Sequence, residues 1–247
     1  MSGRARIAVL ASGGGSNLQA LIDHFATTAA HAGEIALVAS NQLATGAIDR
    51  ANTVGIPTLT IANPADGDAL LRSLDAAHVD VLVLAGYLKL VPIGVVRAFR
   101  GRVLNVHPAL LPAFGGAGMY GSRVHEAVLA AGATITGPTV HFVDEEFDRG
   151  AIIAQWPVPV LPADTSSSLA ARVLRVEHRL LPLCVAAVAS GAIVLGDDGR
   201  VHGELDVPVP PDAPELRFAL VNDPFPVAPQ LSDPATIAQD VARLFPR

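Results

Sequence analysis

An amide and an imidazole stand two residues apart in the segment Asn105-Val106-His107-Pro108. The apolar residues around them predict a β-strand over residues 102–106. Side chains two positions apart on a strand point to the same face, so Asn105 and His107 would face one reacting atom. An amide donor beside an imidazole suits a reaction in which an oxygen gains negative charge. A histidine at a strand end is also a common structural residue, and the pair alone leaves that alternative open.

A loop rich in carboxylates lies between His141 and Gly150, with the side chains Asp144, Glu145, Glu146 and Asp148. Such a cluster is typical of a solvated turn, which is our interpretation of Glu145 and Glu146. Gly150 permits a tight return of the chain, so Asp148 could approach His107 and orient or charge its ring. The distance between Asp148 and His107 does not follow from the sequence.

The same residues allow a second interpretation. His107, His141 and Asp148 are compatible with a metal site of two histidines and one carboxylate. No close pair of histidines and no helical spacing of ligands supports such a site. We therefore expect chemistry without a bound metal.

The glycine-rich segment Ser12-Gly13-Gly14-Gly15-Ser16-Asn17 directly follows an apolar run over residues 6–11. Glycines let the backbone turn sharply and approach a ligand, and the free N–H groups of a following helix favour an anion. The segment lacks both the dinucleotide fingerprint and the Lys-Ser/Thr pair of a nucleoside-triphosphate loop. It therefore favours a phosphate of mononucleotide size. A plain strand-to-helix turn capped by Ser16 is the alternative.

The elements that would position these residues alternate between strand and helix. Short apolar runs predict strands at residues 6–11, 35–39, 57–61, 79–85 and 102–106. Helical spacing appears between them, after Asn63-Pro64 and after Pro92. This alternation predicts an α/β fold with a doubly wound, mostly parallel sheet, and a Rossmann-like unit over about residues 1–100.

The second half adds a hairpin-like pair of strands and a long helix. Residues 135–143 and 151–160 are expected to join the sheet, with a turn at Asp148-Arg149-Gly150 between them. Residues 166–189 predict the helix, with capping oxygens at its start, and Pro182 should kink or restart it.

The end of the chain differs in composition. A small hairpin is expected around Asp197-Asp198-Gly199. Residues 206–247 are rich in proline and predict only a short helix near Asp233-Pro234. We therefore expect one domain over residues 1–205, with halves of about 1–100 and 101–205, and a C-terminal extension over residues 206–247.

Composition limits the classes of partner. The chain has 247 residues, of which 51% are hydrophobic and only 16% are charged, and its net charge is −6. This balance predicts no basic surface for nucleic acid, and apolar runs of about 18 residues that would span a membrane are absent. Gly13, Gly14 and Gly15 interrupt the first apolar run, as a secretory signal would not. The single cysteine, Cys184, excludes an intrachain disulfide, and we expect a cytoplasmic protein with small-molecule substrates.

Four segments together resemble the phosphoribosylglycinamide (glycinamide ribonucleotide) formyltransferase family. They are Val9-Leu10-Ala11-Ser12-Gly13-Gly14-Gly15-Ser16-Asn17-Leu18-Gln19-Ala20, Leu84-Ala85-Gly86-Tyr87, Asn105-Val106-His107-Pro108-Ala109-Leu110-Leu111-Pro112, and Thr139-Val140-His141-Phe142-Val143 with Asp148. The resemblance covers roughly residues 5–205. It implies transfer of the formyl group of 10-formyltetrahydrofolate, the co-substrate, to the amine of 5'-phosphoribosylglycinamide in purine biosynthesis. It also allows a homodimer.

The resemblance assigns roles to residues in four groups. It implies that the catalytic residues are Asn105, His107 and Asp148. It implies that the substrate phosphate is held by Gly15, Ser16 and Asn17, and that the glycinamide part contacts Glu177. It implies that the folate is bordered by Lys89, Leu90, Val91, Val143 and Asp144. The connection over residues 113–121 is longer and richer in glycine than in many members, and Leu174 stands where some relatives have a polar substrate contact.

Other functions are weighed against this one. A 10-formyltetrahydrofolate hydrolase would use water in place of the amine, but such proteins usually carry a regulatory domain ahead of the glycine-rich loop, which begins here at Ser12. A formyltransferase acting on initiator transfer RNA would have a larger C-terminal domain and a basic surface. A non-catalytic nucleotide-binding module is allowed by the glycine-rich segment, and the set of Asn105, His107 and Asp148 argues against it.

Overall fold

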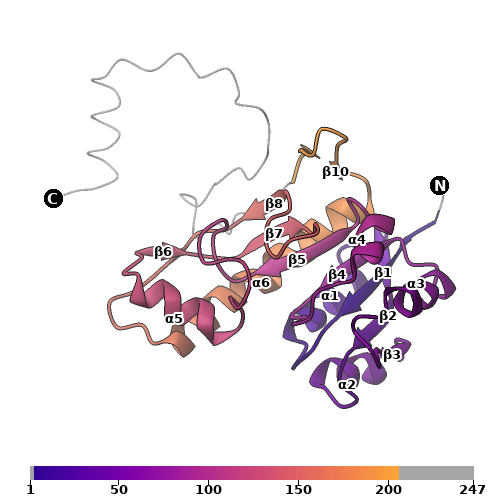
Figure 1. Ribbon diagram of the computed structural model, residues 1–247, viewed down its shortest axis with the longest axis horizontal. Helices are drawn as coiled ribbons and strands as arrows, with labels where there is room; N and C mark the ends of the chain where they lie inside the picture. Colours follow the sequence, from indigo (N-terminus) through magenta and orange to yellow (C-terminus); the bar gives the residue numbers. More distant parts are fainter. Residues whose placement is uncertain (1–2, 206–247) are drawn as a thin grey trace.

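The structure is a computed structural model that describes residues 3–205. The C-terminal extension, including the helix expected near Asp233, lies outside the described residues. Within the described part, one mixed sheet carries helices on both of its faces (Figure 1). The doubly wound α/β prediction is confirmed.

The sheet has seven strands in the order β3-β2-β1-β4-β5-β7-β8. Five are parallel: β1 (Ala5–Leu10), β2 (Gly33–Ser40), β3 (Thr58–Thr60), β4 (Val81–Leu84) and β5 (Val103–His107). The last two, β7 (Thr139–Phe142) and β8 (Ile152–Gln155), are antiparallel and form the predicted hairpin-like pair. Every residue of β4 is buried, as expected for a central parallel strand covered on both faces.

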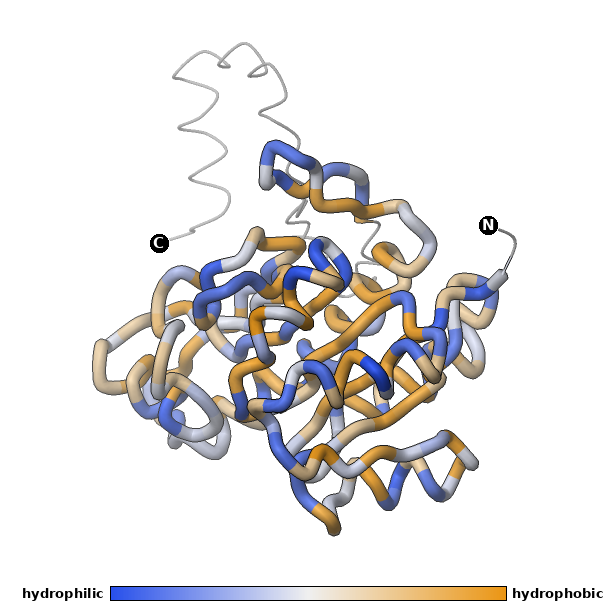
Figure 2. Tube along the Cα trace, turned by 45° about the vertical axis from the view of Figure 1, so that its right-hand side comes forward, coloured by the Kyte–Doolittle hydropathy of each residue, from blue (hydrophilic) through white to orange (hydrophobic). Residues whose placement is uncertain are grey.

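Two hydrophobic clusters lie on opposite faces of the sheet. One face packs against α1 (Ser16–Ala26), α2 (Gly46–Thr53) and α6 (Ser166–Ala189). The other face packs against α3 (Gly67–Ala76) and α4 (Ile93–Ala98). Alternate residues of β1 contribute to each cluster, with Ile7 and Val9 on one face and Ala8 and Leu10 on the other. The hydrophobic segments accordingly run through the middle of the molecule (Figure 2).

The long helix α6 spans the predicted residues. It begins at a capping box in which Thr165 and Ser168 exchange hydrogen bonds. The predicted restart at Pro182 is wrong, because the helix continues through this residue. Pro182 has no N–H to donate to the carbonyl of His178, so one helical hydrogen bond is missing there. Buried neighbours such as Leu181 and Val185 hold the helix in the core on both sides of Pro182.

One helix and two small sheets complete the described part of the fold. The helix α5 (Ser122–Ala130) packs against α6. The strands β6 (Ile135–Thr136) and β9 (Val158–Pro159) form a two-stranded sheet. The strands β10 (Ile193–Leu195) and β11 (Val201–Gly203) form the small hairpin that the sequence predicts.

Candidate active site

A cavity of about 740 Å³ lies at the carboxyl ends of the parallel strands, where open α/β sheets bind ligands. Three chain segments meet there. The backbone N–H of Ser12, after β1, donates to the carbonyl of Gly86, after β4, and the Ser12 hydroxyl accepts from the N–H of Leu88. Asn105 and His107 line the same cavity from the end of β5.

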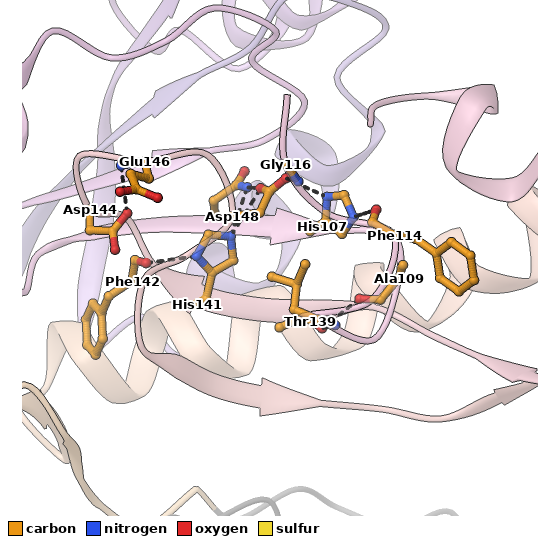
Figure 3. A network of polar contacts seen from close by, with 12 residues as sticks. His107, Ala109, Phe114, Gly116, Thr139, His141, Phe142, Asp144, Glu146 and Asp148 are labelled. Atoms are coloured by element: carbon orange, nitrogen blue, oxygen red, sulfur yellow. Dashed lines mark hydrogen bonds and ion pairs between the residues drawn. The ribbon is translucent and has the colours of Figure 1, made fainter. Parts of the chain in front are cut away.

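Asn105, His107 and Asp148 converge in this cavity, and Figure 3 shows His107 and Asp148 near one another. Asn105 Nδ2 lies 3.4 Å from Asp148 Oδ1. His107 Nδ1 lies 3.5 Å from Asp148 Oδ2, and both side chains are more than nine-tenths buried. The approach of Asp148 to His107, which the sequence only allowed, is confirmed. Asn105 and His107 also point to the same site, as strand alternation predicted.

The carbonyl of Phe114 fixes the protonation pattern of His107. His107 Nε2 lies 2.8 Å from this oxygen. Because a carbonyl only accepts, Nε2 carries the hydrogen of the neutral ring, and the lone pair on Nδ1 faces Asp148. Burial lowers the pKa of His107, while Asp148 and the Phe114 carbonyl act in the opposite direction. His107 can donate from Nδ1 only after it gains a proton.

Asp148 is held as a carboxylate. Burial opposes its ionisation, but the groups around it, among them His107 and the backbone N–H of Gly116, outweigh burial and lower its pKa. The Gly116 N–H donates to Asp148 Oδ2 at 2.9 Å. The start of the glycine-rich connection over residues 113–121 therefore contacts both His107 and Asp148.

The loop that carries Asp148 returns as tightly as the sequence suggested. A Cβ atom at Gly150 would lie 1.8 Å from the carbonyl oxygen of Phe142, so only glycine fits. Glu145 and Glu146 are exposed, which confirms their assignment to a solvated turn. Glu145 pairs with Arg97 at the surface at 2.8 Å.

The glycine-rich loop ends at the start of α1. Gly15 is the N-cap residue, with φ of 72°, and among the described residues no side chain caps this helix. The alternative in which Ser16 caps a plain turn is therefore not what the structure has. A Cβ atom at Gly15 would lie 2.6 Å from Ala47 Cα, so α2 packs directly on the loop. The first N–H groups of α1 remain available to an anion.

Glu177 on α6 meets the glycine-rich loop through Asn17. Asn17 Nδ2 donates to Glu177 Oε2 at 2.6 Å. Burial raises the pKa of Glu177, and this hydrogen bond opposes the rise. Asn17 Oδ1 is buried and has no hydrogen-bond partner within the described part of the chain. Both side chains line the cavity that holds Asn105 and His107.

The segments expected near the folate line the other part of this cavity. They contribute Lys89, Leu90, Val91, Val143 and Asp144. Leu174 also lines the cavity. Ser16 instead lines a neighbouring groove together with Arg50 and His178. The structure thus gathers all the predicted site residues around two adjoining hollows, except Gly15, which directly precedes Ser16 in the chain.

Comparison with known proteins decides the family. A model of the formyl transferase family matches residues 5–185. A crystal structure of phosphoribosylglycinamide formyltransferase from Anaplasma phagocytophilum is 37% identical, with a TM-score of 0.75, over 83% of this chain and 98% of that one. The chain belongs to the phosphoribosylglycinamide formyltransferase family.

Curated members of the family are longer than the matched region. The chain is 43% identical over 202 residues to the chloroplastic phosphoribosylglycinamide formyltransferase of Vigna unguiculata, which covers 79% of this chain and 64% of that protein. The corresponding protein of Arabidopsis thaliana is 44% identical over 203 residues, covering 79% of this chain and 69% of its own length. The chain therefore spans about two thirds of these relatives.

Sequence reasoning missed several groups that this member of the family places in the cavity. His125 on α5 is buried, lines the cavity, and has an Nδ1 atom without a partner in residues 3–205. The Phe114 carbonyl and the Gly116 N–H are backbone groups, so no residue type could indicate them. His125 stood in a segment with no distinctive motif, and only its helical placement brings it to the site.

Two features are absent from residues 3–205. No group of three or more His, Cys, Asp or Glu side chains is placed to hold a metal ion. No helix in this range is long and apolar enough to cross a membrane.

Proposed function

We propose that the chain transfers the formyl group of 10-formyltetrahydrofolate to the amine of 5'-phosphoribosylglycinamide. One observation carries the proposal: Asn105, His107 and Asp148 line the same cavity as Asn17 and Glu177. The first three groups suit acyl transfer through an oxyanion. Asn17 stands at an anion-binding helix start, and Glu177 is hydrogen-bonded to it. A phosphorylated amine and a formyl donor would therefore meet in one space.

The reaction is a direct attack of the substrate amine on the formyl carbon. A carbon–nitrogen bond forms, and the formyl oxygen becomes an oxyanion in a tetrahedral intermediate. Asn105 donates to this oxygen from Nδ2, and protonated His107 donates to it from Nδ1. Asp148, held ionised, accepts the proton of the incoming amine and delivers it to the departing folate nitrogen as the old bond breaks. No step calls on a metal or a covalent enzyme intermediate.

The binding residues divide between the two substrates. The N–H groups at Gly15, Ser16 and Asn17 hold the phosphate, and Glu177 contacts the glycinamide part. The pterin of the co-substrate lies against Lys89, Leu90 and Val91 and against the backbone at Val143 and Asp144. Leu174 is apolar and stands where some relatives have a polar contact to the substrate, so that contact is missing here.

The proposal extends to assembly and compartment. We take the substrates to be small molecules and a homodimer to be the assembly to test first. Cys184 is buried and its burial raises its pKa, so this thiol has a packing role. A chain without a cysteine pair suits a reducing compartment, and the cytoplasm is the compartment we propose.

The test follows the formyl carbon. The chain is incubated with 10-formyltetrahydrofolate labelled with ¹³C in the formyl group, with and without 5'-phosphoribosylglycinamide. We expect the label to appear on the ribonucleotide amine and to stay on the folate when the ribonucleotide is absent. Release of labelled formate at equal rates in both samples would identify a hydrolase instead. Binding of both ligands without turnover would identify a binding module.

A further inference from the structure

We propose that His141 is a positioning residue that fixes the amide of Asn105 in its donating orientation. The inference rests on the proposed function, in which Asn105 donates to the oxyanion. His141 lies on β7, is 1% exposed, and stands directly opposite Asn105 in the antiparallel pairing of β5 with β7. The sheet itself therefore sets the distance between the two side chains.

The backbone fixes the tautomer of His141. His141 Nδ1 lies 2.8 Å from the carbonyl oxygen of Phe142. A carbonyl only accepts, so Nδ1 carries the hydrogen and Nε2 of the neutral ring carries a lone pair. Nε2 lies 3.2 Å from Asn105 Nδ2, where this lone pair accepts from the amide.

Two acceptors then determine how the Asn105 amide is turned. One N–H of Nδ2 donates to His141 Nε2 at 3.2 Å, and the other faces Asp148 Oδ1 at 3.4 Å. Rotating the amide by half a turn would place its oxygen against both acceptors, which is unfavourable. The contact to Asp148 is long for a hydrogen bond, so this second N–H is the one available to a substrate oxygen.

His141 is needed because Asp148 changes during the reaction. When Asp148 takes the proton of the amine, its carboxyl group can donate as well as accept, and it no longer specifies the orientation of the amide. In the neutral His141 ring, Nε2 is an acceptor whether or not Asp148 carries the proton. It keeps the Asn105 donor directed at the oxyanion during the step in which that donor is required.

A matched pair of variants tests this role. His141→Asn ends near the Nδ1 position and lacks the acceptor, whereas His141→Gln can place an amide oxygen near the Nε2 position. Because an oxyanion donor contributes about 10²–10³ in kcat, we expect His141→Asn to lower kcat by about 10² with little change in either KM. We expect His141→Gln to lose about 10-fold or less, the scale of one neutral hydrogen bond.

A double-mutant cycle separates positioning from general structure. If His141 acts through Asn105, then His141→Asn should cost little further kcat once Asn105→Ala is present. Equal losses from His141→Asn in both backgrounds would overturn the proposal. If the unsubstituted chain transfers no formyl group, the proposed function fails first. If Asn105→Ala is defective and His141→Asn is not, only the present inference fails.

Nitrogen NMR of the unsubstituted chain tests the same role without any substituted protein. With ¹⁵N-labelled histidine, the neutral His141 ring should show its hydrogen on Nδ1 and a lone pair on Nε2. A neutral ring with its hydrogen on Nε2 would place two donors face to face. That result would contradict the proposal even if neither variant could be purified.

Discussion

At the scale of single residues, fixed backbone groups orient the side chains of His107 and Asp148. The Phe114 carbonyl holds Nε2–H of His107, and the Gly116 N–H holds one oxygen of Asp148. His107 Nδ1 therefore faces Asp148 and becomes a donor only when the ring is cationic. The pairing with Asp148 is what favours this charge against the cost of burial.

The first prediction concerns the pH dependence of Asp148→Asn. Burial lowers the pKa of His107 and the Asp148 charge raises it. Removing that charge therefore lowers the pKa of His107 further. Activity that needs cationic His107 falls as pH rises through this pKa. We therefore expect the falling limb of kcat/KM against pH to move to lower pH in Asp148→Asn, together with a lower maximum. An unmoved limb, or one at higher pH, would show that Asp148 does not support the charge of His107.

At the scale of elements, the loops after β1 and β5 bring backbone groups to the ligands. The glycine-rich loop is pressed between α1 and α2, where the N–H of Ala47 donates to the Gly13 carbonyl at 3.1 Å. Arg50 on α2 also donates to the Gly14 carbonyl, at 3.0 Å. The shape of the loop is therefore set by α2 as well as by its own glycines.

The second prediction is that Gly15→Val weakens ribonucleotide binding and spares folate binding. A side chain at Gly15 is disfavoured by its positive φ and would meet Ala47, so the first turn of α1 must shift. Gly13→Ala is the matched control, because a Cβ there has nothing within 4 Å among the described residues. Titration of each ligand separately measures the effect. Equal weakening of both ligands by Gly15→Val, with the fold intact, would argue against a phosphate at this loop.

The third prediction concerns the connection over residues 113–121. Its start is tied to the site by Phe114 and Gly116, while Gly118 and Gly121 follow with positive φ. Ordering a glycine-rich segment is entropically costly, so we expect it to become more ordered when substrates bind. Hydrogen exchange of residues 117–121 should slow on addition of both substrates. Fast exchange in both states would show that the substrates do not order this segment.

At the scale of the whole molecule, one buried polar contact joins the two halves of the chain. Asn17 at the start of α1 and Glu177 on α6 are 160 residues apart and make a 2.6 Å hydrogen bond. Burial raises the pKa of Glu177, so its ionised form costs stability. We infer that this residue is kept for the ligand and not for the fold.

The fourth prediction is that Glu177→Gln raises the Tm at pH 7 and weakens ribonucleotide binding. The folded-state pKa of Glu177 is raised, so wild-type stability is fully present below the unfolded-state pKa and declines as pH rises through the folded-state pKa. Gln cannot ionise, so the gain in Tm should shrink toward zero near pH 4. Scanning calorimetry at both pH values measures it. A lower Tm at pH 7 would show that the charge stabilises the fold.

The sequence allowed much of this architecture to be predicted, because the strands and the long helix have strong local patterns. Local patterns predicted the apolar strands β1, β4 and β5 and the shared direction of the Asn105 and His107 side chains. The groups that hold the site together were not. The Phe114 carbonyl, the Gly116 N–H and the placement of His125 result from tertiary packing, which leaves no periodic or compositional trace. The restart of α6 that was one alternative at Pro182 does not occur, because core packing overrides a local helix breaker.

In the proposed reaction, Asn105 and His107 stabilise a charge that exists only near the transition state. Measuring kcat and both KM values for Asn105→Ala tests it most directly, with ligand affinities determined in parallel. We predict that kcat falls by about 10²–10³ while ribonucleotide and folate affinities stay close to those of the unsubstituted chain. A kcat within a few-fold of the unsubstituted chain, or a loss that appears mainly in ligand affinity, would contradict the account.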